Sequence, residues 1–168
     1  MCGLFAIFGQ DESLDQYIDK SSIKKSFFEF NFRGPDNSSF IEYSNKSIKS
    51  YLGHHRLKIL DLTSESNQPL IDDSIILLFN GEIFNFKELN YIYFRNEDFK
   101  SDTILLFNLI KKIGFDETLK LIKGQYAIIV YDLVKGEILC SSDFYGQKPI
   151  YYLHEEECII ISSNLNSI

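Results

Sequence analysis

The chain has 168 residues, of which 45% are hydrophobic and 24% are charged, and its formal net charge is −7. This composition is typical of a globular protein that forms one domain with a substantial core. The negative charge argues against a general affinity for nucleic acid or anionic membranes, and no apolar run approaches the ~20 residues needed to span a bilayer.

The chain begins with an apolar stretch, residues 1–9, that predicts a buried strand ending at Gly9. It lacks the basic segment, long apolar core and cleavage site of a secretory signal. If Met1 is removed, Cys2 carries a thiol with pKa near ~8.5 and an α-amine near ~7.7–8.0 that can act as its base. That is the chemistry of an N-terminal nucleophile, although a small buried thiol early in a strand is an equal alternative.

Hydrophobic periodicity predicts the other elements in chain order. Helices are expected at residues 13–30, 87–94, 102–113 and 115–122, and strands at residues 39–43, 47–57, 75–79, 125–132, 137–142, 149–153 and 158–162. Ser13 is the expected N-cap of the first helix. Residues 126–131 are apolar without alternation, so a strand there must be covered on both faces. Together these elements predict an α+β fold of two stacked antiparallel sheets backed by helices.

The cysteines and histidines give no metal signal. Cys2, Cys140 and Cys158 are odd in number and lack metal-ligand spacing, which favours a reducing cytoplasm with Cys140 and Cys158 as core thiols in strands. His54 and His55 are adjacent, so on a strand they point to opposite faces and cannot readily chelate a metal. A structural role is expected for both histidines.

Three further sites each have two interpretations. Asn80-Gly81 after a buried strand is typical of a hairpin turn, but an Asn amide and a Gly N–H can also stabilise one oxyanion. Arg56 is either a surface charge or a bidentate clamp for a substrate carboxylate. Asp102 is either a helix-cap residue or a partner for a substrate ammonium group.

Eight segments taken together are far more specific than any one residue. In order, they are Cys-Gly-Leu-Phe-Ala-Ile-Phe-Gly at residues 2–9, Arg-Gly-Pro-Asp at 33–36, Leu-Gly-His-His-Arg-Leu-Lys-Ile-Leu-Asp at 52–61, Gln-Pro at 68–69, Asn-Gly-Glu-Ile-Phe-Asn at 80–85, Ser-Asp-Thr at 101–103, Gly-Gln-Tyr-Ala at 124–127 and Gly-Gln-Lys-Pro-Ile-Tyr-Tyr at 146–152. This set resembles the glutamine amidotransferase domain of the asparagine synthetase family, a class II (N-terminal nucleophile) amidotransferase. The resemblance covers essentially the whole chain, residues 1–168.

The resemblance implies a four-layer αββα sandwich of two antiparallel sheets flanked by helices, the N-terminal nucleophile hydrolase fold. It also implies that Cys2, freed of Met1, attacks the side-chain amide of L-glutamine and releases ammonia through a thioester that water hydrolyses. Asn80 and the N–H of Gly81 would stabilise the tetrahedral oxyanion.

The same resemblance implies a set of substrate contacts. Arg56 would hold the glutamine α-carboxylate, while Glu82 and Asp102 would hold its α-ammonium. Backbone groups around Leu57 and Ile59 would line the pocket. No cofactor and no metal is implied.

The chain departs from the family's pattern at six positions, which are Phe32, His55, Phe99, Ile104, Ser142 and Asn164. None of them is a residue to which the resemblance assigns chemistry. Phe99 and Ile104 lie near Asp102 in sequence and bear on glutamine affinity. Ser142 and Asn164 bear on the fit to a synthetase partner.

The adenylating Ser-Gly-Gly-x-Asp-Ser loop of the family's second domain does not occur in these 168 residues, so no synthetase (ATP-binding) domain is expected in them. The ammonia would then pass to an asparagine-synthetase-like domain or separate chain, with aspartate or another carboxylate as acceptor. Two alternatives stay open. One is a catalytically decayed module that binds glutamine or a partner, and the other is an N-terminal nucleophile hydrolase of a different amide. The sequence does not indicate an oligomeric state.

Overall fold

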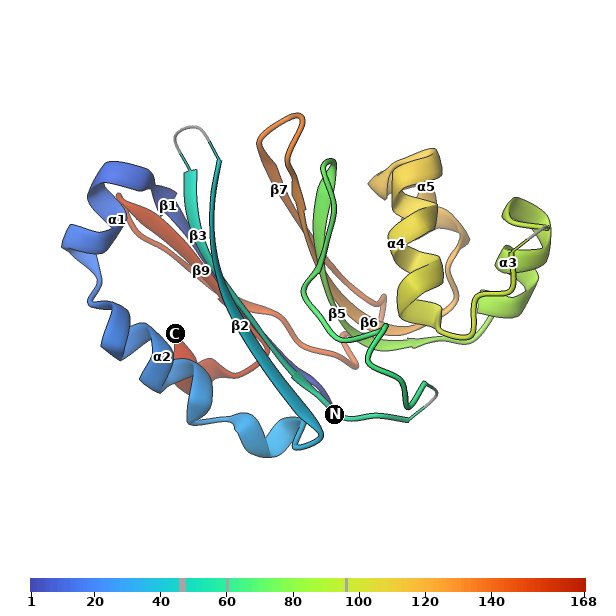
Figure 1. Cartoon of the computed structure of the whole chain (residues 1–168), viewed down its shortest axis with the longest axis horizontal. Helices are drawn as coiled ribbons and strands as arrows, with labels where there is room; N and C mark the ends of the chain where they lie inside the picture. The colour runs from blue at the N-terminus through green and yellow to red at the C-terminus, as the bar shows by residue number, and fades with distance from the viewer. Residues whose placement is uncertain (46–47, 60, 96) are drawn as a thin grey trace. The chain divides into compact units, whose positions relative to one another are not determined.

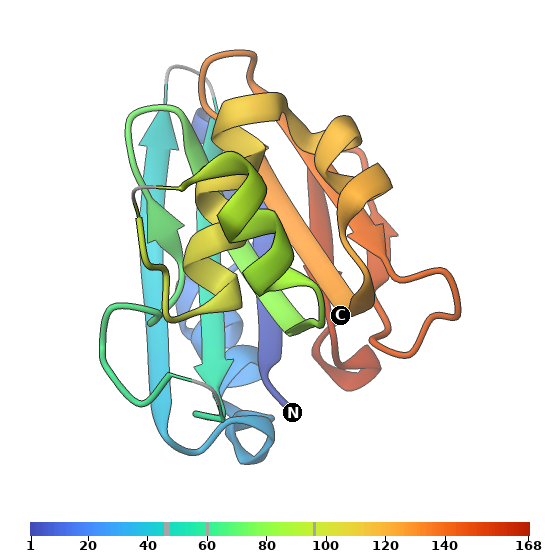
Figure 2. The same ribbon diagram turned by 90° about the vertical axis from the view of Figure 1, so that its right-hand side faces the viewer.

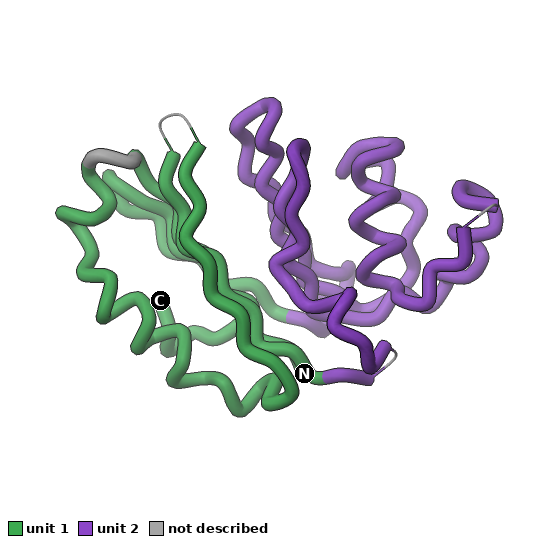
Figure 3. The backbone as a smooth tube through the Cα atoms, viewed as in Figure 1, with its two compact units in different colours: residues 1–57, 149–168 green, residues 58–148 purple. Residues whose placement is uncertain are grey.

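The computed structural model describes residues 1–45, 48–59, 61–95 and 97–168. Residues 46, 47, 60 and 96 lie outside the described residues; they include the first residue of the strand predicted at 47–57 and one residue of the motif at 52–61. The chain forms two compact units, residues 1–57 with 149–168 and residues 58–148 (Figure 3). Within the described ranges, no helix is long and apolar enough to cross a membrane.

The first unit is built on a five-stranded antiparallel sheet with the order β2-β3-β1-β9-β8. Its strands are β1 (Gly3–Gln10), β2 (Asn37–Asn45), β3 (Ile48–Arg56), β8 (Tyr151–His154) and β9 (Cys158–Ser162). Helices α1 (Asp11–Tyr17) and α2 (Lys20–Phe28) lie along one face of this sheet (Figure 1). The 3-10 helices η1 (Asn31–Arg33) and η2 (Leu165–Ser167) complete the unit. Because β1 pairs with β3 on one side and β9 on the other, the N-terminal strand is held at the centre of the sheet.

The helix predicted at residues 13–30 is wrong in two respects, since α1 begins at Asp11 rather than at a Ser13 cap and the chain then forms two helices. Ile18 and Asp19 have extended backbone angles, and the Asp19 carboxylate accepts a hydrogen bond from the N–H of Ser22 at 3.0 Å. An Asp at this position satisfies a backbone donor that a new helix leaves unpaired, so it favours a second helix start over continuation of the first.

A cluster of aromatic rings forms the core between α2 and the sheet. Phe27 packs against Phe5 and Phe40, with ring centroids 5.9 and 5.2 Å away, and stacks on the His55 ring at 3.9 Å. Phe27 and Phe30 meet edge to face at 5.9 Å. Burial of rings of this size supplies much of the hydrophobic stabilisation of a small unit.

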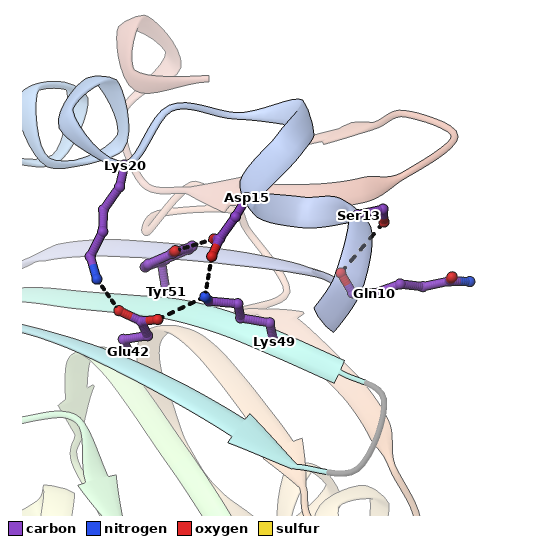
Figure 4. Close-up of polar contacts among 7 residues, drawn as sticks. All are labelled: Gln10, Ser13, Asp15, Lys20, Glu42, Lys49 and Tyr51. Atoms are coloured by element: carbon purple, nitrogen blue, oxygen red, sulfur yellow. Dashed lines mark hydrogen bonds and ion pairs between the residues drawn. The ribbon is translucent and has the colours of Figure 1, made fainter.

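A polar network joins the helices of the first unit to its sheet (Figure 4). Lys49 of β3 forms ion pairs with Asp15 of α1 and, at 2.8 Å, with Glu42 of β2. The Tyr51 hydroxyl donates to Asp15 at 2.5 Å, and Lys20 of α2 pairs with Glu42. The hydrogen bond from Lys49, followed by that from Tyr51, holds the pKa of Asp15 below its ordinary value. The network therefore stabilises the packing of α1 and α2 best when the carboxylates are ionised.

The second unit has a four-stranded antiparallel sheet with the order β4-β5-β6-β7. Its elements are β4 (Leu70–Ile71), β5 (Ile75–Ile83), α3 (Phe86–Tyr93), α4 (Asp102–Ile113), α5 (Phe115–Leu121), β6 (Gly124–Asp132) and β7 (Glu137–Ser142). Figure 2 shows the three helices lying in front of this sheet. Leu77 and Phe79 of β5 and Ile128 of β6 face the helices in one buried cluster with Leu105 of α4.

Most sequence-based elements of the second unit are confirmed, and α4 has the predicted bounds. Ile128 and Ile129, which point to opposite faces of β6, are both buried, as the continuous apolar run indicated. Cys158 is buried as expected. Cys140 lies in a strand as predicted, but the residue is exposed and not in the core, since β7 is the edge strand of its sheet. Two antiparallel sheets with helices along one face of each confirm the α+β class.

Candidate active site

The Cys2 thiol is held by the backbone at the end of a neighbouring strand. Cys2 directly precedes β1, and pairing of Gly3 with His55 brings the end of β3 beside it. The N–H of Leu57, just after β3, donates to Cys2 Sγ at 3.3 Å, and the thiol lies 3.7 Å from the Leu57 carbonyl oxygen to which it donates. A thiol next to the chain terminus thus has a fixed environment inside the first unit.

Arg33 fixes the backbone of Cys2, a role that sequence reasoning missed. Its Nε donates to the Cys2 carbonyl oxygen at 3.2 Å, and its Nη1 donates to the Ser163 carbonyl oxygen at 3.0 Å. A Cβ at Gly34 would lie 2.3 Å from the backbone carbon and oxygen of His55, so only glycine lets the chain after Arg33 run this close to β3. The Arg-Gly-Pro-Asp motif at 33–36 was one of the segments that carry the family resemblance, but no role was predicted for its Arg33.

Arg56 is the last residue of β3, and its side chain is only 5% exposed. The interpretation of Arg56 as a surface charge is therefore wrong. Its carbonyl oxygen accepts the N–H of Asp36 at 3.1 Å, which ties the loop after Gly34 to the end of the strand. A buried guanidinium of this kind is suited to a carboxylate ligand, because it presents a planar fork of donors.

His55 has the structural role that its place on a strand predicted. Its Nδ1 lies 2.7 Å from the Ser38 hydroxyl, its Nε2 lies 2.9 Å from the Phe27 carbonyl oxygen, and its ring stacks on Phe27. Burial lowers the pKa of His55. Among the described residues, no group of three or more His, Cys, Asp or Glu side chains is arranged to hold a metal ion.

In the second unit, Asn80 and Gly81 lie within β5, so the hairpin turn predicted for them is wrong. They pair with Ala127 and Tyr126 of β6. A Cβ at Gly81 would lie 2.2 Å from the Gln125 carbonyl oxygen, and only glycine allows this approach of the two strands. Since Phe79 faces the helices and side chains alternate along a strand, Asn80 and Glu82 share the opposite face of the sheet.

Gln68 holds β5 just before Asn80, although sequence reasoning noted only its place in a motif. Gln68 comes two residues before β4, and its side chain lies against the backbone of Phe79 in β5. Its side-chain oxygen accepts the N–H of Phe79 at 2.6 Å, and its Nε2 donates to the Phe79 carbonyl oxygen at 3.0 Å. The carboxamide thus makes the two bonds that a backbone partner would make, and it fixes the strand where the Asn80 side chain begins.

Asp102 lies at the start of α4 and is directed to the end of β5. Its Oδ2 accepts the N–H of Ile83 at 3.0 Å, and the residue is only 5% exposed. Burial raises the pKa of Asp102, and the nearby Glu82 carboxylate raises it further, against the lowering effect of backbone N–H groups including Ile83. A buried carboxyl group whose pKa a second carboxylate also raises suits a cationic ligand, which would favour the ionised form of both.

The residues singled out by sequence reasoning are divided between the two units. Cys2, Arg56 and Leu57 belong to the first unit, where Cys2 and Leu57 are in contact. The second unit contains Ile59, Asn80, Gly81, Glu82 and Asp102, of which the last four lie on β5 or at the start of α4. Ile59 is 71% exposed and lies outside any helix or strand.

A family model described as a glutamine amidotransferase domain matches residues 1–168. A Methanocaldococcus jannaschii protein named for glutamine-hydrolysing asparagine synthesis is 34% identical over all of this chain and 35% of its own length. Asparagine synthetase 2 (glutamine-hydrolysing) of Bacillus subtilis is 32% identical over all of this chain and 22% of its own length. The glutamine-hydrolysing asparagine synthetase of Bos taurus is 29% identical over 94% of this chain and 27% of its own length. The chain thus spans between 22% and 35% of the length of these relatives.

Among solved structures, glutamine phosphoribosylpyrophosphate amidotransferase from Bacillus subtilis, complexed with ADP and GMP, aligns with a TM-score of 0.75. The alignment covers 99% of this chain and 42% of that chain at 19% identity. A likeness at this identity concerns the fold alone. It confirms the N-terminal nucleophile hydrolase fold that the sequence resemblance implied.

Proposed function

Because the chain belongs to the family of glutamine amidotransferase domains, we propose that it hydrolyses L-glutamine to glutamate and ammonia with Cys2 as the nucleophile. The main support for the proposal is the fixed thiol of Cys2. Its sulfur accepts a hydrogen bond from the Leu57 N–H at 3.3 Å, and Cys2 directly precedes the central buried strand β1. Met1 is 57% exposed, so its removal is sterically open and would leave the α-amine of Cys2 as a base beside the thiol.

The reaction begins when Cys2 Sγ attacks the side-chain carboxamide carbon of glutamine. The thiol proton passes to the α-amine of Cys2, which then protonates the departing nitrogen as the C–N bond breaks and ammonia leaves. Water attacks the resulting thioester, its proton returns through the amine to the sulfur, and glutamate is released. One water is consumed for each glutamine, and the enzyme returns to its starting state.

Asn80 and Gly81 are proposed to stabilise the oxyanion that forms in each step. An Asn amide and a backbone N–H supply two donors for one oxygen, and removal of one donor in other enzymes costs about 10²–10³ in rate. Support comes from the fixed position of Asn80 on β5, where pairing with Ala127 and the Gln68 contact to Phe79 hold the strand.

The charged residues are proposed to bind the backbone of glutamine, with Arg56 on its α-carboxylate and Glu82 and Asp102 on its α-ammonium. Backbone groups of Leu57 and Ile59 would line the pocket. Support comes from the charges themselves: Arg56 is a buried cation at the end of β3, and Asp102 is a buried carboxyl at the start of α4 with Glu82 at the end of β5. This set of charges matches a zwitterion, whose two charges require one cation and one or more anions.

The ammonia is proposed to serve a synthetase domain or a separate synthetase chain. The relatives are glutamine-hydrolysing asparagine synthetases several times as long as this chain, so ammonia transfer to an activated carboxylate such as that of aspartate is the favoured use. The reaction would take place in the cytoplasm, where a catalytic thiol stays reduced.

The test is an intact-mass measurement before and after treatment with the glutamine-like electrophile 6-diazo-5-oxo-norleucine, together with an assay of ammonia release from glutamine. We expect Met1 to be absent and a single adduct to form on Cys2. The Cys2→Ala variant should lose both the adduct and the ammonia release. The matched control is Cys140→Ala, which removes an exposed thiol and should leave both unchanged.

Three results would count against the proposal. If Cys2→Ala hydrolyses glutamine as fast as the parent, Cys2 is not the nucleophile. Thermal stabilisation by glutamine with Met1 absent, no adduct and no ammonia would instead identify a glutamine-binding module without catalysis. Faster turnover of another amide in the same assay would point to a different N-terminal nucleophile hydrolase.

A further inference from the structure

The end of β1 next to the nucleophile is held by a side chain in place of a regular ladder bond. In the register of β1 with β9, Phe5 stands opposite Ser162, so Leu4 stands opposite Ser163. A hydrogen-bonded antiparallel pair normally exchanges two backbone N–H to C=O bonds. Here the Ser163 N–H donates to the Leu4 carbonyl oxygen at 3.0 Å, but the Leu4 N–H donates to the Ser163 hydroxyl oxygen at 2.9 Å.

This exchange releases the Ser163 carbonyl group for another donor. The carbonyl oxygen accepts Nη1 of Arg33 at 3.0 Å, and Nε of the same guanidinium donates to the Cys2 carbonyl oxygen at 3.2 Å. Arg33 therefore bridges the backbone of residue 163 and that of the nucleophile. The hydroxyl gives the Leu4 N–H an acceptor other than the Ser163 carbonyl oxygen, so this carbonyl group can be oriented toward Arg33 rather than toward the ladder.

The segment that carries Ser163 is itself fixed. Ser163 is 1% exposed, and the hydroxyl of the preceding Ser162 donates to the Leu4 carbonyl oxygen at 3.1 Å. The Ser162 hydroxyl also lies 2.7 Å from that of Ser167 and accepts the N–H of Asn164 at 3.0 Å. These bonds hold the backbone on both sides of Ser163.

We propose that Ser163 is a positioning residue for the nucleophile: its hydroxyl accepts the Leu4 N–H and thereby keeps the Ser163 carbonyl on Arg33, which holds Cys2 in its attacking position. The inference rests on the proposed glutaminase function. Among the described residues, the hydrogen bonds of Ser163 go to Leu4 and Arg33, and none goes to Cys2 Sγ or to a residue proposed to bind glutamine. Loss of the Ser163 hydroxyl should therefore lower kcat and leave KM nearly unchanged.

The experiment compares steady-state glutamine hydrolysis by the parent, Ser163→Ala and Ser163→Thr. In Ser163→Ala the carbonyl of residue 163 turns back to the Leu4 N–H and leaves Arg33. Because a misplacement of about 1 Å can cost ~10²-fold in rate, we expect kcat to fall about tenfold to a hundredfold with KM within about twofold. Ser163→Thr keeps the hydroxyl and should restore kcat to within about threefold of the parent.

The matched control is Ser50→Ala. Ser50 is also fully buried in the first unit, and its hydroxyl donates to one backbone carbonyl, that of Tyr43, at 3.0 Å. It stands opposite Phe8, at the other end of β1 from Cys2. The melting temperature of Ser50→Ala should fall about as much as that of Ser163→Ala, while its kcat should equal the parent's. This result would separate a positioning role of Ser163 from a general loss of packing.

The inference is overturned if folded Ser163→Ala keeps the parent's kcat, or if Ser50→Ala loses as much kcat as Ser163→Ala. If Ser163→Ala does not fold, Ser163→Cys replaces it, since sulfur preserves the volume but accepts a hydrogen bond weakly; a kcat equal to the parent's would then have the same meaning. A parent without ammonia release, or a fully active Cys2→Ala variant, would overturn the proposed function itself.

Discussion

Asp102→Asn tests whether the carboxyl groups of the second unit bind the α-ammonium of glutamine. The amide is nearly isosteric and its oxygen can still accept the Ile83 N–H, which lies 3.0 Å from Oδ2 in the parent. The substitution therefore removes the charge and preserves the local geometry. Asp102 is 5% exposed, so water cannot readily replace the lost interaction.

The magnitude follows from the change in hydrogen-bond type. A hydrogen bond to a charged group contributes about 1.5–3 kcal/mol and a neutral one about 0.5–1.5 kcal/mol. Losing the charge at one of two carboxylates should thus weaken binding by about 1–1.5 kcal/mol. At 1.36 kcal/mol for each tenfold change, KM for glutamine should rise about five- to thirteenfold. The kcat value should change less, because Asp102 is not proposed to touch the reacting carbon.

The pH dependence provides a second, independent readout. Burial, and then Glu82, raise the pKa of Asp102 in the folded protein. As pH falls through that raised pKa, the parent's KM should increase because protonation removes the charge, whereas the variant should lack this component. The folded parent binds this proton more tightly than the unfolded chain does, so its stability declines as pH rises from the ordinary carboxyl range through the raised pKa. The stability of the variant relative to the parent should therefore increase over the same interval.

The assay measures KM by ammonia release across the acidic to neutral range, with urea unfolding at each pH. The control is Asp116→Asn, the same change at an exposed residue in the first turn of α5, which should alter neither quantity. A KM for Asp102→Asn within twofold of the parent's would refute the proposed ammonium contact. An increased KM with an unchanged pH profile would refute the assignment of the titration to Asp102.

Four further predictions concern other parts of the molecule. Asn80→Ala should lower kcat about 10²–10³-fold in the ammonia assay with KM little changed; a loss below tenfold in a folded variant would exclude an oxyanion role. Phe27→Ala removes the ring that stacks on His55 and should lower the free energy of unfolding by about 3–5 kcal/mol in urea titrations. Gln68→Ala removes the side chain that bonds the buried N–H and C=O of Phe79 and should lower the free energy of unfolding by about 1–3 kcal/mol. An unchanged free energy of unfolding would mean that these two backbone groups find other hydrogen-bond partners. Asp15→Asn should be less stable than the parent at neutral pH, and the difference should vanish as pH falls through the lowered pKa of Asp15, because that pKa is depressed only in the folded state.

The sequence predicted those elements whose signals are local. Helix α4 has the predicted bounds because both of its ends are encoded nearby: the Ser101 side chain accepts the Thr103 N–H at 3.2 Å, and Gly114 adopts a positive φ of 86°. The motif set also identified the family and the fold, which the comparisons confirm. The proposed roles of Cys2 and Asp102 remain predictions.

The sequence failed where a distant strand decides the local conformation. Asn80-Gly81 is a strong turn signal, but pairing of β5 with β6 continues through both residues to Ile83. The backbone of Tyr126 and Gln125 supplies the contacts that keep the pair extended, and those residues lie more than forty positions away in the printed sequence. Local propensity is a weak guide when a ladder of this length competes with it.

The two residues that sequence reasoning missed most completely use the same device. Gln68 and Ser163 each lie just outside a strand, and each gives a backbone group of a neighbouring strand a hydrogen bond from a side chain where a ladder would use the backbone. Each of these bonds lies close to a residue with a proposed catalytic role. Gln68 bonds Phe79, which directly precedes Asn80, and Ser163 is linked to Cys2 through Arg33. A hydroxyl or carboxamide at the end of a ladder has no signature in composition or periodicity, because its meaning depends on the register of a strand far away in the chain. The role of such a residue can be recognised only when the strand pairing is known. A search for positioning residues in related domains should therefore begin at the ends of paired strands.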